Sequence, residues 1–140
     1  MMSDLFAYGT LMSEDIMFAV CRTHYSGVEG ILQDYRRWQF KGEVYPGMMK
    51  QEGGRVEGII YRDISTENWN RLDAFEGERF SREIVNVGAA DGTFRSAHTY
   101  VLKAEFAGQL SDSPWELESF LRTGKPLFES AYFGFDVLKS

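Results

Sequence analysis

The stretch Leu72-Asp73-Ala74-Phe75-Glu76-Gly77 closes a predicted helix with an acid at its carboxyl end. Ser65, or the threonine after it, can cap the start of this helix. Trp69 and Glu76 then lie on the same face, because residues seven positions apart are neighbours along a helix surface. Gly77 is the residue type that commonly ends a helix in a left-handed turn. The pattern therefore predicts a helix that begins near Ser65 and ends at Gly77.

Glu76 is the chemically unusual residue of this helix. Unpaired carbonyl groups and the negative end of the helix dipole gather at a carboxyl end, so burial and the dipole both raise the pKa of an acid there. A carboxyl group whose pKa lies nearer neutrality can take a proton and return it, as a general acid/base must. The alternative is a glutamate at a frayed helix end that points into water.

Length and composition restrict the class of protein. A chain of 140 residues with 44% apolar and 15% aromatic residues suits one domain, residues 1–140, around one core. A net charge of −6 argues against a nucleic-acid partner, and the basic cluster Arg36-Arg37 is short. No apolar run is long enough to span a membrane, and the first residues do not resemble a secretion signal. A single cysteine, Cys21, fits a reducing compartment, so we expect a cytoplasmic protein.

The first residues predict a strand, a tight turn and a helix. Leu5-Phe6-Ala7-Tyr8 is a short apolar run, as expected for a strand covered on both faces. Gly9-Thr10 ends it, and Ser13 precedes an acidic first helical turn. Such a turn directs backbone N–H groups toward one point, and glycine lets a ligand approach the main chain closely. An anion such as a carboxylate would fit there.

The remaining patterns predict several strands and one further helix. Four segments have strand composition: residues 28–44, 56–61, 82–87 and 94–102. Glu52-Gly53-Gly54 predicts a turn, and Asp91-Gly92 predicts a hairpin. Ser113-Pro114-Trp115-Glu116 has the signature of a helix start, with Gly124 as its end. Short strands with about three helices among them predict a single α+β domain whose mixed sheet is strongly curved or barrel-like.

Other kinds of active site have little support in the sequence. The two histidines, His24 and His98, lie far apart, so a metal site is not expected. Histidine-dependent catalysis would need a nucleophile beside one of them, and no pattern supplies it. His98 is expected to be a packed strand residue, and Cys21 a buried apolar filler. No cofactor-binding loop pattern is present, so no cofactor is expected.

Two separated motifs resemble one family. The segment Phe6-Ala7-Tyr8-Gly9-Thr10-Leu11-Met12 is similar to the N-terminal Tyr-Gly-Thr/Ser-Leu motif of the gamma-glutamylcyclotransferase-like proteins, including their plant avirulence-induced and gamma-glutamylamine cyclotransferase branches. The segment Leu72 to Gly77, with Phe80, Arg82 and Val85, resembles their Leu-Asp-x-Phe-Glu-Gly…Tyr-x-Arg-x-x-Val pattern. The motifs occur in the family's order, and the resemblance covers about the first 120 residues.

The resemblance implies a curved or barrel-like α+β fold and a set of site residues. It assigns the acid/base role to Glu76, and it implies that the loop Tyr8, Gly9, Thr10 and Leu11 holds a substrate α-carboxylate through main-chain N–H groups. Phe80 stands where the family usually has tyrosine, so the hydroxyl group is absent there. Tyr100 can supply a phenol to the pocket, or it is an ordinary strand tyrosine. Arg82 is either a substrate contact or a structural ion-pair partner.

The implied activity is that of a gamma-glutamyl (amine) cyclotransferase, which releases 5-oxoproline and a free amine or amino acid. Because the substrate's own amine closes the lactam, neither a cofactor nor an enzyme nucleophile is needed. The expected partner is a small gamma-glutamyl molecule, and the expected assembly is a monomer or homodimer. Two alternatives stay open: a non-catalytic module that binds a small carboxylate or a peptide end in stress signalling, and a gamma-glutamyl-removing enzyme of a biosynthetic pathway. The aromatic tail, Phe128 to Leu138, is expected to cover a sheet edge, complete the pocket or form a dimer contact.

Overall fold

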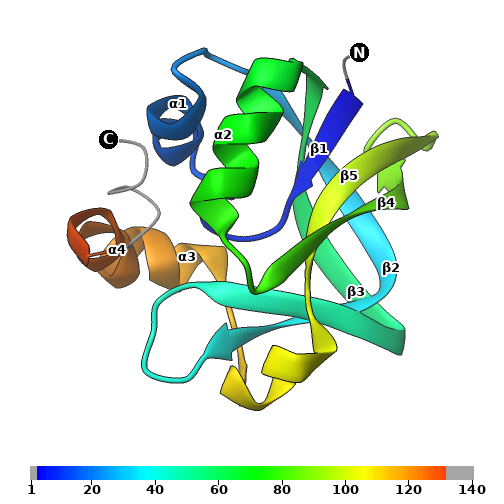
Figure 1. The fold of residues 1–140 in the computed structure, drawn as a ribbon. Coiled ribbons are helices and arrows are strands. Elements are labelled where there is room, and N and C mark those ends of the chain that lie inside the picture. Colours follow the sequence, from blue (N-terminus) through cyan, green and yellow to red (C-terminus); the bar gives the residue numbers. More distant parts are fainter. Residues whose placement is uncertain (1–2, 132–140) are drawn as a thin grey trace.

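A computed structural model describes residues 3–131 of the 140-residue chain. Five strands close into a mixed barrel in the order β3-β1-β5-β4-β2 and back to β3 (Figure 1). Strand β6 pairs with the end of β2, at Trp38 and Phe40. Strands β1 and β5 are parallel, and the other pairs are antiparallel. The predicted barrel-like α+β fold is therefore confirmed. The strands are β1 Ser3–Ala7, β2 Gly27–Phe40, β3 Pro46–Ile64, β4 Phe80–Ala89, β5 Phe94–Leu102 and β6 Leu110–Pro114.

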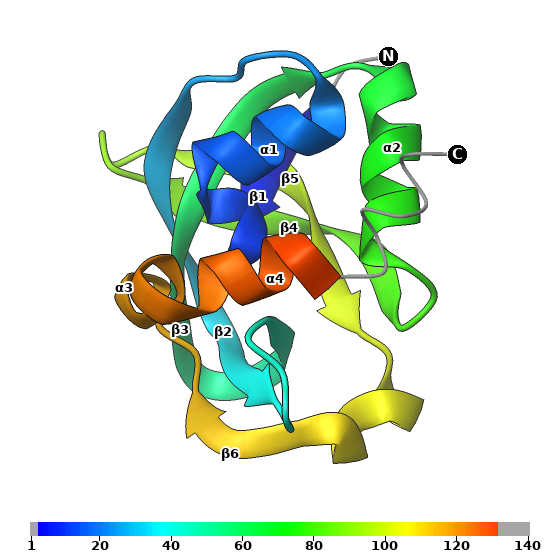
Figure 2. The ribbon, with the colours of Figure 1, turned by 90° about the vertical axis from the view of Figure 1, so that its left-hand side faces the viewer.

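The helices gather on one side of the barrel (Figure 2). They are α1 Glu14–Cys21, α2 Thr66–Glu76, α3 Leu117–Ser119 and α4 Lys125–Ala131, with a π-helical turn Phe120–Gly124 between the last two. Strand β1 separates two clusters of buried side chains. Phe6 and Tyr8 pack with residues of other strands, whereas Leu5 and Ala7 pack in a cluster that includes residues of α1 and α2. Alternation along β1 thus fills the barrel on one face and seats the helices on the other.

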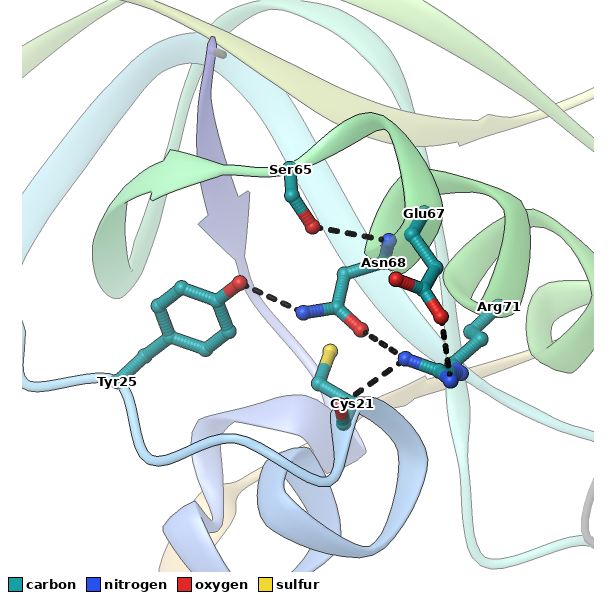
Figure 3. Close-up of polar contacts among 6 residues, drawn as sticks. All are labelled: Cys21, Tyr25, Ser65, Glu67, Asn68 and Arg71. Atoms are coloured by element: carbon teal, nitrogen blue, oxygen red, sulfur yellow. Dashed lines mark hydrogen bonds and ion pairs between the residues drawn. The ribbon is translucent and has the colours of Figure 1, made fainter.

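Helix α2 begins and ends where the sequence predicts. The Ser65 hydroxyl accepts a hydrogen bond from the Asn68 N–H at 3.2 Å, and Gly77 ends the helix with a φ of +85°. Polar contacts hold its first turns against the segment that follows α1 (Figure 3). Asn68 donates to the Tyr25 hydroxyl at 2.7 Å, and Arg71 donates to the Cys21 carbonyl oxygen at 3.4 Å. These contacts fix the helix that carries Glu76.

The predicted turn at Glu52-Gly53-Gly54 is wrong, because β3 continues through it as one 19-residue strand. The glycines form a bulge where the β2–β3 register shifts between Gln33 and Tyr35. Gly53 has a φ of +81°, and its N–H donates to the Asp34 carboxylate at 3.0 Å. A bulge of this kind bends the strand, as a closed barrel requires.

The predicted boundaries of the last helical segment are also wrong. Pro114 ends strand β6 opposite Trp38 of β2, and α3 begins only at Leu117. The indole N–H of Trp115 donates to the Val44 carbonyl oxygen at 2.8 Å, so tertiary pairing overrides the local capping signal. The predicted strand 28–44 is correspondingly shorter, because β2 ends at Phe40 and the chain turns there.

Gly124 does not end a helix, because the π-helical turn runs on into α4. A Cβ atom at this position would lie 3.0 Å from the Cβ of Val44 and 3.1 Å from the Phe120 ring. Gly124 therefore allows close approach between the helix and the loop that carries Val44. The predicted hairpin at Asp91-Gly92 is confirmed, with the Gly92 N–H donating to the Ala89 carbonyl oxygen at 3.0 Å.

Candidate functional site

The loop after β1 forms one wall of a pocket. The Met12 N–H donates to the Gly9 carbonyl oxygen at 2.9 Å, which closes a short 3₁₀ turn over Thr10–Met12. A Cβ atom on Gly9 would lie 2.8 Å from the Pro46 side chain, so only glycine fits beneath that proline. The Tyr61 hydroxyl donates to the Leu11 carbonyl oxygen at 2.8 Å and anchors the far end of the loop.

Arg37 holds the near end of the same loop. Its guanidinium donates to the carbonyl oxygens of Tyr8 at 2.5 Å, Glu57 at 2.7 Å and Trp115 at 3.2 Å. The guanidinium carbon of Arg37 also lies over the Trp115 ring, 5.1 Å from the ring centroid. Because C=O and N–H point in opposite directions across a trans peptide, the bond to the Tyr8 oxygen directs the Gly9 N–H away from Arg37. The sequence shows only a short basic cluster here and gives no sign of this role.

Glu76 and the loop line the same pocket. The lining residues are 5–11, Tyr45, Pro46, Glu76, Tyr100 and Phe128. The last residue of α2 thus faces the first loop of the chain across a concave surface. The free volume is about 20 Å³, enough for about one water molecule. A larger ligand therefore enters only when side chains of the wall move.

Burial raises the pKa of the Glu76 carboxyl from 4.5 to about 8. The negative charge of Asp73, one turn earlier on α2, adds to the rise, and the positive charge of Arg79 opposes it. Arg79 is held by other partners, because it donates to the Tyr45 hydroxyl at 2.8 Å and lies over the Phe40 ring at 4.5 Å. Burial, one of the two causes expected from the sequence, is the largest cause of this rise.

Tyr100 reaches the pocket from β5, and a pair of charged side chains lies behind it. Its hydroxyl donates to Asp73 Oδ1 at 2.7 Å. Arg82 Nε lies 3.3 Å from the same oxygen, and its guanidinium is stacked 4.4 Å above the Trp69 ring. The predicted pocket tyrosine therefore does line the pocket, and it is bound to an aspartate that the sequence did not single out.

Two other residues expected in the site lie elsewhere among the described residues. Arg82 does not line the pocket, because its side chain pairs with Asp73 outside it, so the structural ion-pair alternative describes its position. Phe80 is buried in the core, with its ring centroid 6.2 Å from that of Phe40. Of the aromatic tail, Phe128 completes the pocket wall, and residues 132–138 lie outside the described part of the chain.

The histidines and the cysteine take structural positions. His98 packs 5.1 Å from the Trp69 ring, and burial lowers its pKa. His24 stacks on Phe18 at 4.2 Å. Cys21 is buried, which raises its pKa to about 12. Within residues 3–131, no three histidine, cysteine or acidic side chains come together as metal ligands, and no helix has the length and apolarity to cross a membrane.

Comparison with known proteins identifies the family. The model of the family described as gamma-glutamyl cyclotransferase, AIG2-like, matches residues 5–118. The chain belongs to this family. An AIG2-like protein C of Arabidopsis thaliana is 28% identical over 129 residues, covering 91% of this chain and 74% of that protein. A Methanocaldococcus jannaschii protein described as a gamma-glutamylcyclotransferase and putative RNase is 26% identical over 102 residues, covering 71% of this chain and 46% of that protein.

Solved structures agree with the AIG2-like assignment at the level of the fold. A solution structure from Arabidopsis thaliana superposes with a TM-score of 0.73 at 21% identity, covering 93% of this chain and 79% of that one. An AIG2-like protein from Mus musculus has a TM-score of 0.65 at 21% identity, covering 82% of this chain and 86% of that one. The matched region, residues 5–118, includes the loop at Tyr8 to Leu11 and also Glu76.

Proposed function

We propose that this AIG2-like protein is a gamma-glutamyl cyclotransferase that converts a small gamma-glutamyl amide into 5-oxoproline and a free amine. The observation that carries the proposal is the shared pocket. A half-buried acid whose pKa is raised to about 8 lies in one cavity with the glycine-containing loop after β1. A purely binding pocket gains nothing from an acid that resists ionisation, whereas a proton-transfer site needs one.

Ring closure needs little more than correct geometry. The substrate's α-amino nitrogen attacks its own γ-carbonyl carbon, a C–N bond forms, and the bond to the leaving amine breaks. Glu76 takes one proton from the attacking ammonium group and gives it to the departing nitrogen. The second proton, which the attacking nitrogen loses once the ring has closed, passes through the same carboxylate to the released amine, so no water is consumed. Holding the chain in its closing shape can remove about 7 kcal/mol or more of barrier when the reacting atoms are well oriented.

The loop would hold the opposite end of the substrate. The first N–H groups of a helical turn have no acceptor within that turn, so those of Gly9, Thr10 and Leu11 can bind the α-carboxylate. Pro46 and Gly9 both line the pocket, and Pro46 occupies the side on which a Cβ atom of residue 9 would lie. With the carboxylate held there, the α-amine can be directed toward Glu76 across the pocket.

The substrate's α-ammonium group and the Glu76 carboxyl group, which exchange a proton in this reaction, have similar pKa values. A free α-ammonium group has a pKa of about 8 in water. The Glu76 pKa is also about 8, so the proton moves between groups of similar strength. The acid must be ionised before it can accept a proton, and turnover should therefore rise with pH through neutrality toward pH 8.

A panel assay tests the function directly. The purified protein is incubated with gamma-glutamyl amino acids, gamma-glutamyl-ε-lysine and gamma-glutamyl alkylamines, and 5-oxoproline is measured. We expect turnover of at least one class, and a loss of about 10²- to 10⁴-fold in Glu76→Gln. Glu67→Gln is the matched control, because Glu67 lies on the same helix and pairs with Arg71 at its exposed side.

The outcomes of this assay distinguish the proposed cyclotransferase from the two alternative functions. Full turnover in Glu76→Gln would contradict the assigned acid/base role. No reaction across the panel would favour the non-catalytic module that binds a carboxylate or a peptide end. Turnover confined to one gamma-glutamyl-protected metabolite would instead favour the enzyme of a biosynthetic pathway.

A further inference from the structure

The proton of the Tyr100 hydroxyl is directed out of the pocket. A tyrosine has one hydroxyl proton, and here it is donated to Asp73 Oδ1 at 2.7 Å. Asp73 also pairs with Arg82, whose Nε lies 3.3 Å from the same oxygen. An ionised carboxylate accepts hydrogen bonds and donates none. The phenolic oxygen therefore has only its lone pairs left for a ligand in the pocket.

Tyr100 is fixed in this orientation from several sides. Arg82 is stacked over the Trp69 ring, so the charged partner of Asp73 is itself positioned by the helix. The Tyr8 hydroxyl donates to the Tyr100 carbonyl oxygen at 2.6 Å, which joins the base of the tyrosine to the site loop. Burial and the charges of Glu76 and Asp73 raise the pKa of the Tyr100 hydroxyl, so it stays a neutral acceptor.

Glu76 and Tyr100 line the same pocket as the loop from Tyr8 to Leu11, and both carry oxygens that can accept hydrogen bonds, Glu76 most strongly when it is ionised. A primary ammonium group fits two acceptors, because it carries three N–H donors and a positive charge. We propose that Tyr100, oriented by Asp73, accepts a hydrogen bond from the substrate's α-ammonium group and makes that group a requirement for binding. Asp73 acts through Tyr100 and is a positioning residue.

This inference rests on the proposed function and adds a basis for substrate selection. Glu76 alone could take the proton, but one acceptor does not fix the direction of the nitrogen lone pair. A second acceptor at Tyr100 holds the amine while its proton leaves, so the lone pair is directed at the γ-carbonyl carbon. Molecules of similar size that lack the ammonium group offer Tyr100 no donor and should bind more weakly.

The test compares binding of L-glutamate with binding of glutarate, which has the same carbon skeleton without the ammonium group. Isothermal titration with the full chain should show at least tenfold tighter binding of L-glutamate. In Tyr100→Phe this ratio should fall close to the smaller value that Glu76 alone provides. Asp73→Asn should lower it severalfold, because a neutral amide oxygen is a weaker acceptor. The double variant should fall no further than Tyr100→Phe, because Asp73 acts through the tyrosine.

Matched controls separate this role from a loss of packing. Tyr25→Phe removes a phenol that binds Asn68 outside the pocket, and Glu67→Gln removes an acid from the same helix as Asp73. Both should keep the wild-type ratio. A wild-type ratio near one, an unchanged ratio in Tyr100→Phe, or additive effects of the two substitutions would each overturn the inference.

Turnover distinguishes this inference from the proposed function. If 5-oxoproline is formed, Tyr100→Phe should raise KM about tenfold and lower kcat by a smaller factor. If no gamma-glutamyl compound reacts but the binding ratio depends on Tyr100 and Asp73, the ammonium site stands and the cyclotransferase activity fails. If turnover occurs and the ratio does not depend on Tyr100, the activity stands and this assignment fails.

Discussion

Replacing Glu76 with glutamine should stabilise the protein, and the gain should depend on pH. The pKa of Glu76 is about 8 in the folded chain, and its ordinary value, expected in the unfolded chain, is 4.5. The folded state therefore holds a proton that the unfolded state has released. The favourable contribution of this group is complete below pH 4.5 and is lost as the pH rises to about 8. Glutamine resembles the protonated acid and has no such loss.

The size of the effect follows from the two pKa values. Each pH unit between them changes the free energy of unfolding by at most about 1.4 kcal/mol. At pH 7 the full difference is about 3 kcal/mol. Glu76 is partly exposed, and water that enters the pocket lowers this figure, so we expect Glu76→Gln to be about 2 kcal/mol more stable than the wild type at pH 7. At pH 5 the gain should be below about 1 kcal/mol.

Urea denaturation at pH 5, 6, 7 and 8 measures this difference without any substrate. Glu67→Gln serves as the control, because its side chain is 76% exposed and its stability difference from the wild type should stay nearly constant. A Glu76→Gln difference that does not change between pH 5 and pH 8 would refute the raised pKa. An acid/base role for Glu76 would then lose its main support.

Three further substitutions test the scaffold of the site. Arg37→Met leaves the carbonyl oxygen of Tyr8 and two others without their donor, and should lower the free energy of unfolding by about 2 to 4 kcal/mol in urea denaturation; a loss below 1 kcal/mol would contradict its anchoring role. Gly9→Ala forces a Cβ to 2.8 Å from Pro46, so 5-oxoproline production should fall at least tenfold while the circular dichroism spectrum stays unchanged; wild-type turnover would show that the close approach is not needed. Gly124→Ala should lower stability by about 1 to 3 kcal/mol in thermal denaturation, although alanine favours helices; a gain would mean that packing there has room.

Local chemistry explains which elements the sequence predicted well. Ser65 and Gly77 mark the ends of α2 because capping and a positive φ depend on residues within a few positions. The Asp91-Gly92 hairpin is predicted for the same reason. A glycine by itself, however, does not show which structural role it plays. Gly53 serves a bulge and Gly124 a close approach, and each was predicted to mark a turn or a helix end.

The supporting residues of the site could not be predicted because they act over long sequence distances. Arg37 reaches a carbonyl oxygen 29 positions away, and Asp73 accepts from Tyr100 across 27 positions. Closure of the barrel creates these contacts, and neither residue has a local signal for its role. Glu76 could be singled out because its conflict with the helix end is visible within one turn. The family resemblance supplied the loop as its counterpart.

The pocket wall has a divided origin, and this division affects how the protein can be modified. Strand β5, helix α2 and the loop after β1 supply Tyr100, Glu76 and the backbone beside Gly9, whereas Tyr45 and Phe128 come from a surface loop and the last described helix. Libraries that vary only the loop and α4 should therefore yield variants with altered preference for the leaving amine while the proton-transfer machinery stays intact.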